Sequence, residues 1–258
     1  MTIEVEQRDH LLLMGVRRPE KMNALSRDMY HSLARACHRL EQDPDLWVGV
    51  IWAEGPHFTS GVDLNDWAEA FASGKPFPVG EGEIDPFSIT GPRLSKPLVI
   101  AVQGRCYTWG WELLLNTDLR VAATDTRFAM LEVRRGFYAC GGATLRLPRQ
   151  IGWGNAQRYL LTGDELGATE AHRLGLVQEL CEPGQQLEAA LALAQRVAKA
   201  APLGVQGSLR SSRLCMLEGE AAAVGPMFDG MAQVMRSEDA AEGVRSFVER
   251  RQAVFKGR

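Results

Sequence analysis

Hydrophobic and polar residues follow two different periods along the chain. Continuous or alternating apolar runs are typical of β-strands, and they predict strands at residues 3–7, 11–16, 47–52, 98–102, 119–123, 128–129 and 177–181. Apolar residues spaced three or four apart are typical of amphipathic helices, and they predict helices at 27–43, 63–71, 143–151, 153–162, 169–174, 187–200, 202–213, 218–236 and 238–250. Trp111, Leu114 and Leu115 predict one more helix, after strand 98–102. Ser26 and Ser237 stand where N-caps are expected. The chain is therefore predicted to be an α/β protein.

The order of strand, glycine-containing loop and helix occurs twice, at residues 47–71 and within 96–118. This predicts a spiral of similar layers. Residues 72–92 hold several prolines and glycines and show no period, which is typical of a long functional loop or lid. Only helices are predicted after about residue 200, so we expect a mixed α/β core over 1–200 and a helical region over 201–258.

Composition excludes several classes of protein. The 258 residues are 45% hydrophobic and 24% charged, with a net charge of −3 that offers no basic face for nucleic acid. No apolar run approaches the ~20 residues that span a membrane, and the N-terminus does not resemble a signal peptide. The five cysteines are scattered, without the spacing of a zinc site. We expect a cytoplasmic protein without a metal.

Two carboxylates stand in apolar surroundings. Glu112 falls in the first turn of the helix that follows strand 98–102, between two tryptophans and three leucines. Glu132 follows the short strand at 128–129, and pairing with Arg134 or Arg135 is the structural alternative to a catalytic role. A carboxylate is costly to bury without a partner, and a helix start supplies free N–H groups for a developing negative charge. The pair therefore indicates acid–base chemistry beside an anion.

Four segments, taken together, resemble the crotonase superfamily of enoyl-CoA hydratases and isomerases. HFTSGVDL resembles the family's F-S-A-G-A-D-L loop, and VIAVQGRCYTWGWELLLNTDLRVA its A-V-N-G-Y-A-x-G-G-G-x-E-L-x-x-x-C-D segment. RFAMLEVRRGFYACGGATLRLPR resembles its F-x-x-P-E-x-x-x-G-x-x-P-G-x-G-G-x-x-R-L-P-R segment, and EGVRSFVERRQAVFKGR its C-terminal helix and tail. The resemblance implies a crotonase-like spiral of ββα units with a C-terminal helical trimerisation region.

The resemblance also implies the roles of individual residues. Glu112 and Glu132 would be the catalytic pair, and the backbone N–H groups of Val62 and Trp109 would form the oxyanion hole. Contacts to coenzyme A would come from Lys21, Ala24, Leu25, Ser60, Asp63, Leu64, Phe255 and Lys256. The substrate would be an acyl-CoA thioester, with no cofactor besides that coenzyme A, and the assembly a homotrimer or a hexamer of two trimers.

Departures from the family pattern fall around the acyl site. Thr108-Trp109-Gly110 stands where the family has three glycines, Leu131 replaces the proline before Glu132, and Cys140 replaces a glycine. We expect Trp109, Trp111, Tyr138 and Cys140 to form a narrow aromatic pocket, to which Tyr107 could add. Such a pocket would favour a flat, branched or cyclic acyl group, or one with a polar atom for an indole N–H. Alternatively, Trp109 packs into the core and leaves an ordinary pocket.

Several functions compete. Reversible water addition to a 2-enoyl-CoA is the first, followed by double-bond isomerisation, which needs one glutamate, and by hydrolysis or lyase chemistry on a specialised acyl group. A non-catalytic CoA-thioester binder would be expected to lack Glu112 or Glu132. A nucleotide binder is disfavoured because the glycine loops do not match a P-loop or dinucleotide fingerprint. A triad of Ser60, His57 and Asp63 would need residues too close in sequence to converge.

Overall fold

The computed structural model describes residues 3–258 and contains two β-sheets. The larger has the strand order β1-β2-β3-β4-β6-β9. Its strands are β1 (Ile3–Arg8), β2 (Leu11–Val16), β3 (Val48–Ala53), β4 (Leu98–Val102), β6 (Leu119–Ala123) and β9 (Glu179–Cys181). β1 and β2 form an antiparallel hairpin, and every later pair is parallel. β4 is buried at all of its positions, as expected for a parallel strand covered on both faces.

A small second sheet turns the chain into a spiral. Its strands, in the order β5-β7-β8, are β5 (Arg105–Tyr107), β7 (Arg127–Ala129) and β8 (Leu166–Gly167). β4, β5 and α3 (Trp109–Asn116) form one ββα unit, and β6, β7 and α4 (Ala143–Ile151) form the next. Thr59 bridges to Cys106 of β5, so β3, this bridge and α2 (Leu64–Ala72) repeat the pattern. The predicted crotonase-like spiral is confirmed.

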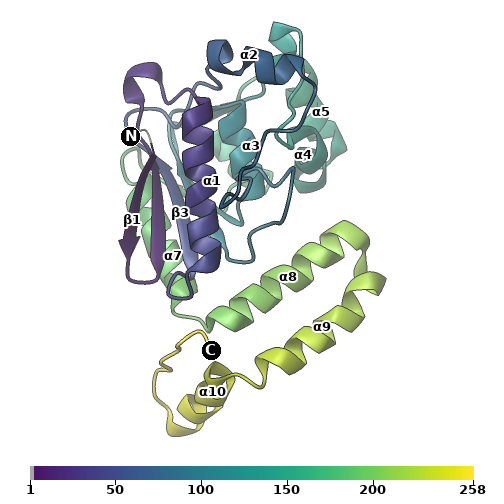
Figure 1. The fold of residues 1–258 in the computed structure, drawn as a ribbon. Coiled ribbons are helices and arrows are strands. Elements are labelled where there is room, and N and C mark those ends of the chain that lie inside the picture. Colours follow the sequence, from purple (N-terminus) through teal and green to yellow (C-terminus); the bar gives the residue numbers. More distant parts are fainter. Residues whose placement is uncertain (1–2) are drawn as a thin grey trace.

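Helices cover both faces of the large sheet. α1 (Arg27–Gln42) packs on one face and α7 (Gln186–Ala198) on the other (Figure 1). The larger apolar core lies between the sheet and α1, α2 and α3, whereas a smaller one joins the sheet to α7. The remaining helices of the α/β part are α4, α5 (Trp153–Thr162) and α6 (Ala168–Arg173), with 3-10 turns η1 (Pro19–Lys21) and η2 (Glu132–Arg135). The segment from 73 to 97 has no helix or strand, and it contains the loop predicted at 72–92 apart from Ala72, which ends α2.

The C-terminal helices extend away from this body. They are α8 (Pro202–Glu218), α9 (Glu220–Val234) and α10 (Glu238–Glu249), and α8 packs lengthwise against α9 (Figure 1). The predicted caps are confirmed, because the Ser26 and Ser237 hydroxyls accept from the N–H groups of Met29 and Ala240. The division into a core over 1–200 and a helical region over 201–258 stays a prediction. α8, the first of the C-terminal helices, begins close to that boundary.

The main difference from the predicted elements is β5. Gln103 and Gly104 indicate the end of β4, and a three-residue strand that follows them carries no measurable period. β5 is a strand because it pairs with β7, which lies further along the chain, and a short stretch of sequence does not reveal such a pairing.

Candidate active site

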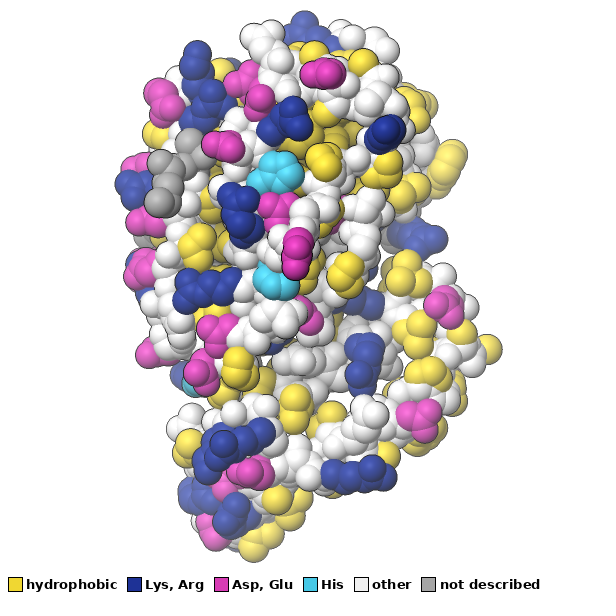
Figure 2. All heavy atoms as spheres, in the orientation of Figure 1, with side chains coloured by type: hydrophobic (Ala, Val, Ile, Leu, Met, Phe, Trp, Pro, Cys, Tyr) yellow, Lys and Arg dark blue, Asp and Glu magenta, His cyan; other side chains and the backbone are white. Residues whose placement is uncertain are grey.

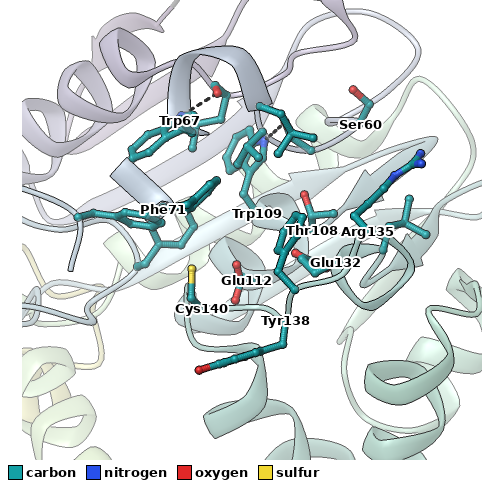
Figure 3. Close-up of a pocket in the computed structure, with 18 residues that line it drawn as sticks. Ser60, Trp67, Phe71, Thr108, Trp109, Glu112, Glu132, Arg135, Tyr138 and Cys140 are labelled. Atoms are coloured by element: carbon teal, nitrogen blue, oxygen red, sulfur yellow. Dashed lines mark hydrogen bonds between the residues drawn. The ribbon is translucent and has the colours of Figure 1, made fainter. Parts of the chain in front are cut away.

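A cavity of about 200 Å³ opens where α2, the start of α3 and residues 131–140 meet. Glu112 and Glu132 both line it, together with Val62, Trp109 and a set of aromatic side chains (Figure 3). The parallel strands place the glycine loops after β3 and β4 at the same edge of the sheet, which is where α/β folds bind ligands. The cavity therefore unites segments that the sequence keeps far apart.

Glu112 is held at the floor of the cavity by the first turn of α3. Its side chain is buried, and its Oε1 accepts a hydrogen bond from the Ala143 N–H at 3.1 Å. A Cβ on Gly141 would lie 2.6 Å from Oε2, so only glycine fits beside this carboxyl. Burial raises the pKa of Glu112 to about 8, and the neighbouring Glu132 carboxyl contributes to the rise.

Glu132 begins η2 and is also buried, but its carboxyl is less well supplied with hydrogen bonds than that of Glu112. Its Oε2 has no hydrogen-bond partner within the described residues, and burial raises its pKa to about 7. Arg134 pairs with Asp164 at 3.0 Å instead, and Arg135 forms no ion pair with any carboxylate of residues 3–258. The structural alternative, in which a neighbouring arginine neutralises Glu132, is therefore wrong.

Two backbone N–H groups remain free beside the carboxyls. Val62 and Trp109 line the cavity, and neither N–H donates to a protein acceptor within residues 3–258. Trp109 is the first residue of α3, where helical N–H groups lack partners. Gly61 precedes Val62 with φ of 125° and lies so close to Thr108 that an added Cβ would meet the Thr108 Oγ1 at 2.7 Å. The two N–H groups are thus available to an oxyanion.

Comparisons with known proteins identify the family of the chain. The sequence model described as enoyl-CoA hydratase/isomerase matches residues 6–258. This chain belongs to the enoyl-CoA hydratase/isomerase family. It is 37% identical to "Enoyl-CoA hydratase EchA19" of Mycobacterium tuberculosis over 98% of this chain and 96% of the relative.

Other members are similar over comparable lengths. "Mevalonyl-coenzyme A hydratase sidH" of Aspergillus fumigatus is 32% identical over 94% of this chain and 90% of the relative. A crystal structure of a probable enoyl-CoA hydratase/isomerase from Mycobacterium abscessus superposes with a TM-score of 0.96 at 44% identity, covering 100% of this chain and 99% of that one. The fold of the whole chain is therefore the family's fold.

The residues expected to contact coenzyme A divide into two groups. Leu25, Ser60 and Leu64 line the cavity. Lys21 is exposed on η1, and the half-buried Ala24 follows it; neither lines the cavity. Asp63 does not line it either and forms an ion pair with Arg18 at 3.1 Å. That pair, and the Nδ1 of His57 accepting from the Arg105 N–H, leave no Ser60–His57–Asp63 triad.

The tail residues do not reach the cavity of their own chain. Phe255 packs against the core cluster between the sheet and α7, and Asp239 of α10 accepts hydrogen bonds from the N–H groups of Lys256 and Gly257. The C-terminus lies at the opposite end of the molecule from α2 (Figure 1). Phe255 and Lys256 therefore make no contact with the cavity of their own chain, and their expected contact with coenzyme A stays a prediction.

The residues expected to form the acyl pocket differ in whether they line the cavity. Tyr138 and Cys140 line the cavity, and burial together with Glu112 and Glu132 raises the pKa of the Cys140 thiol to about 11. Trp111 is wrong as a pocket residue, because it is fully buried against Phe128 and Tyr159. Positions 109 and 112 share one face of α3, whereas 111 lies on another. Tyr107 also lies outside the pocket lining and donates to Glu165.

Trp109 combines the two alternatives for its side chain. It is 2% exposed and packs against Phe58 and Phe87, yet it also forms part of the cavity wall. Its indole N–H donates to the Gly61 carbonyl at 2.8 Å (Figure 3). The indole is therefore unavailable as a donor to substrate, and the expectation of a polar acyl atom bound to it is wrong.

Several lining residues were not predicted from sequence. They are Trp67, Phe71, Phe77, Phe87, Thr108, Leu131, Arg135 and Phe137. Trp67 and Phe71 are four residues apart on the helix after the first glycine loop, a spacing that places both on one face. This spacing is visible in the sequence, so both residues could have been predicted to line the cavity. Phe77 and Phe87 lie in the aperiodic loop, where no pattern indicates direction.

Proposed function

We propose that this protein catalyses the reversible addition of water to a 2-enoyl-CoA thioester. The observation that carries the proposal is the pair of buried carboxyls, Glu112 and Glu132, beside two free N–H groups. The raised pKa values of about 8 and about 7 mean that near neutral pH the pair holds about one proton. One carboxylate can then accept a proton from water while the other carboxylic acid delivers one to the α-carbon.

The N–H groups of Val62 and Trp109 would bind the thioester oxygen as it gains negative charge. In an oxyanion hole, losing one such donor costs about 10²–10³ in rate. Water would attack the β-carbon from the side of the carboxyls, and the product would be a 3-hydroxyacyl-CoA. The reaction as proposed uses no cofactor beyond the coenzyme A of the substrate.

Replacing each carboxyl by an amide tests this proposal. Glu112→Gln and Glu132→Gln should each lower turnover of a short 2-enoyl-CoA by about 10² or more, because a positioned acid or base is lost. Circular dichroism would establish that each variant is folded, and Glu188→Gln on the exposed face of α7 serves as the matched control. Near-normal turnover in either variant would remove that residue from the mechanism. Double-bond migration without water uptake would instead favour the isomerase.

We also infer that the chain assembles as a homotrimer, alone or doubled to a hexamer. Large apolar side chains are exposed along the C-terminal helices (Figure 2), among them Met227, Phe228, Met231, Met235, Phe247 and Val248. A patch of this kind on one region of a chain is typical of an interface. Light scattering should give a mass that is a multiple of three protomers, and a monomer at micromolar concentration would contradict it.

We place the protein in the cytoplasm. All five cysteines are free thiols, which supports a reducing compartment. No helix within residues 3–258 is both long and apolar enough to cross a membrane.

A further inference from the structure

The side of the cavity away from Ser60 is built from aromatic rings. Ser60 and Arg135 lie on one side of the two glutamates in Figure 3, and Trp67, Phe71 and Cys140 on the other. The rings form a continuous arc in the order Trp109, Phe87, Phe77, Trp67, Phe71 and Phe137, and all six line the cavity. Their successive centroid separations are 6.5, 6.1, 4.8, 5.8 and 6.3 Å. These distances fall in the range at which aromatic rings attract one another.

The arc offers aromatic carbon and no polar group. Its two indole N–H groups are already used, since Trp67 donates to the Leu25 carbonyl at 3.0 Å and Trp109 to the Gly61 carbonyl at 2.8 Å (Figure 3). The Tyr138 hydroxyl points away from the glutamates in the same view, and its side chain is 71% exposed. A polar or charged acyl substituent placed against the arc would lose its water without gaining a partner.

The position of the arc is fixed by the chain around it. Asp85 is 1% exposed and accepts from the N–H groups of Phe87 and Ile89 at 2.9 and 2.8 Å, while the Tyr30 hydroxyl also donates to it. The long loop is thus anchored at the point where it supplies Phe87. A rigid flat wall favours a flat ligand, because a flexible chain loses rotational freedom on binding.

We propose that the acyl group this enzyme takes is an apolar one that carries a single aromatic ring on its β-carbon. The inference rests on the proposed hydratase function, which places the β-carbon at the glutamates and the rest of the acyl group on the arc. The cavity of about 200 Å³ suits one ring, since a cavity of ~150 Å³ lined by apolar side chains accommodates benzene. The reaction joins a 3-aryl-2-propenoyl-CoA and water to a 3-aryl-3-hydroxypropanoyl-CoA.

Dehydration is the direction in which to measure this reaction. The α-proton and the β-hydroxyl leave as water, and the new double bond is conjugated with the ring, which favours the aryl alkene. The substrates to compare are 3-hydroxy-3-phenylpropanoyl-CoA and 3-hydroxynonanoyl-CoA, which have the same number of acyl carbons. Each ring–ring contact is worth about 2- to 10-fold, so kcat/KM should favour the aryl substrate at least ~10-fold. Phe71→Leu/Phe77→Leu should reduce that ratio by about 5-fold or more, whereas Trp153→Leu, an exposed aromatic residue on α5 outside the cavity lining, should not change it.

A binding measurement separates this inference from the hydratase proposal. Titration calorimetry would compare 3-phenylpropanoyl-CoA with nonanoyl-CoA, neither of which can be dehydrated. Tighter binding of the phenyl compound without turnover of either hydroxyacyl substrate would support the aromatic specificity and refute the hydratase. Turnover of both substrates with equal or better use of the linear one would refute the aromatic specificity and leave the hydratase standing. An unchanged aryl-to-alkyl ratio in the Phe71/Phe77 double variant would also overturn it.

Discussion

Replacing Glu112 by glutamine should make the protein more stable at alkaline pH while it destroys activity. The pKa of this buried carboxyl is raised from 4.5 to about 8. At about 1.4 kcal/mol for each pKa unit, holding it ionised in the folded chain costs roughly 5 kcal/mol above pH 8. Glutamine avoids this cost but places an amide N–H₂ where Oε2 lies against Gly141, and an unsatisfied buried donor costs about 1–3 kcal/mol. The net gain is therefore about 2–4 kcal/mol.

The gain must depend on pH in a defined direction. Between pH 4.5 and pH 8 the folded wild type keeps the Glu112 proton that the unfolded chain has released, so its stability falls as pH rises through that window. The glutamine variant lacks this dependence. It should be slightly less stable than the wild type below pH 4.5, and its advantage should grow up to about pH 8 and then stay constant.

Urea unfolding followed by tryptophan fluorescence measures this difference. We would compare free energies of unfolding at pH 5, 6.5 and 8.5, at one protein concentration because assembly shifts apparent stability. Glu188→Gln, an exposed carboxyl on α7, is the control and should show no pH-dependent gain. A Glu112→Gln difference that is the same at every pH would refute the reasoning, since it would mean that burial does not raise this pKa.

Three further predictions concern the rest of the site. The pH profile of wild-type kcat/KM should be bell-shaped, with limbs near the pair's pKa values of about 7 and about 8, and a flat profile from pH 5.5 to 9.5 would contradict the acid–base pair. Thr108→Gly should raise the thermal midpoint, because φ of 50° and ψ of −114° strain a β-branched residue by about 1–3 kcal/mol; a lowered midpoint would refute that strain. Arg135→Ala should raise KM for a CoA thioester by about 5-fold or more but leave KM for the N-acetylcysteamine thioester unchanged. The Arg135 guanidinium, which has no carboxylate partner among residues 3–258, lies on the Ser60 side of the cavity and suits a phosphate that only the CoA thioester carries.

The sequence predicts the positions of the two glutamates better than the aromatic residues that line the rest of the cavity. Strands such as 98–102 are continuous apolar runs, and the helices that follow them have a clear period, so the elements that hold Glu112 and Glu132 can be recognised. The error at Trp111 is instructive in this respect. Two tryptophans flank Gly110, and only the helical phase relative to Glu112 shows that Trp109 faces the cavity and Trp111 the core.

What the sequence cannot predict depends on contacts between distant segments. Phe77 and Phe87 become cavity residues because Asp85, Tyr30 and the loop backbone bond to one another, and no local pattern encodes that anchoring. The tail is a similar case. The family pattern assigns Phe255 a contact with substrate, whereas the chain folds Phe255 onto its own sheet, far from its own cavity.

The features that suit this site to the proposed reaction are also features that destabilise the folded chain. The Glu132 Oε2 is buried and has no hydrogen-bond partner among residues 3–258, which leaves it free to bind a substrate water. Thr108 occupies a backbone conformation that suits glycine, and this conformation brings the N–H of Trp109 to the start of α3 beside Val62. An aromatic wall without free donors excludes bulk water from the carboxyls, and this burial is the main cause of their raised pKa values. Substitutions that relieve these features should therefore stabilise the fold and slow the reaction together, as trade-offs between stability and activity require.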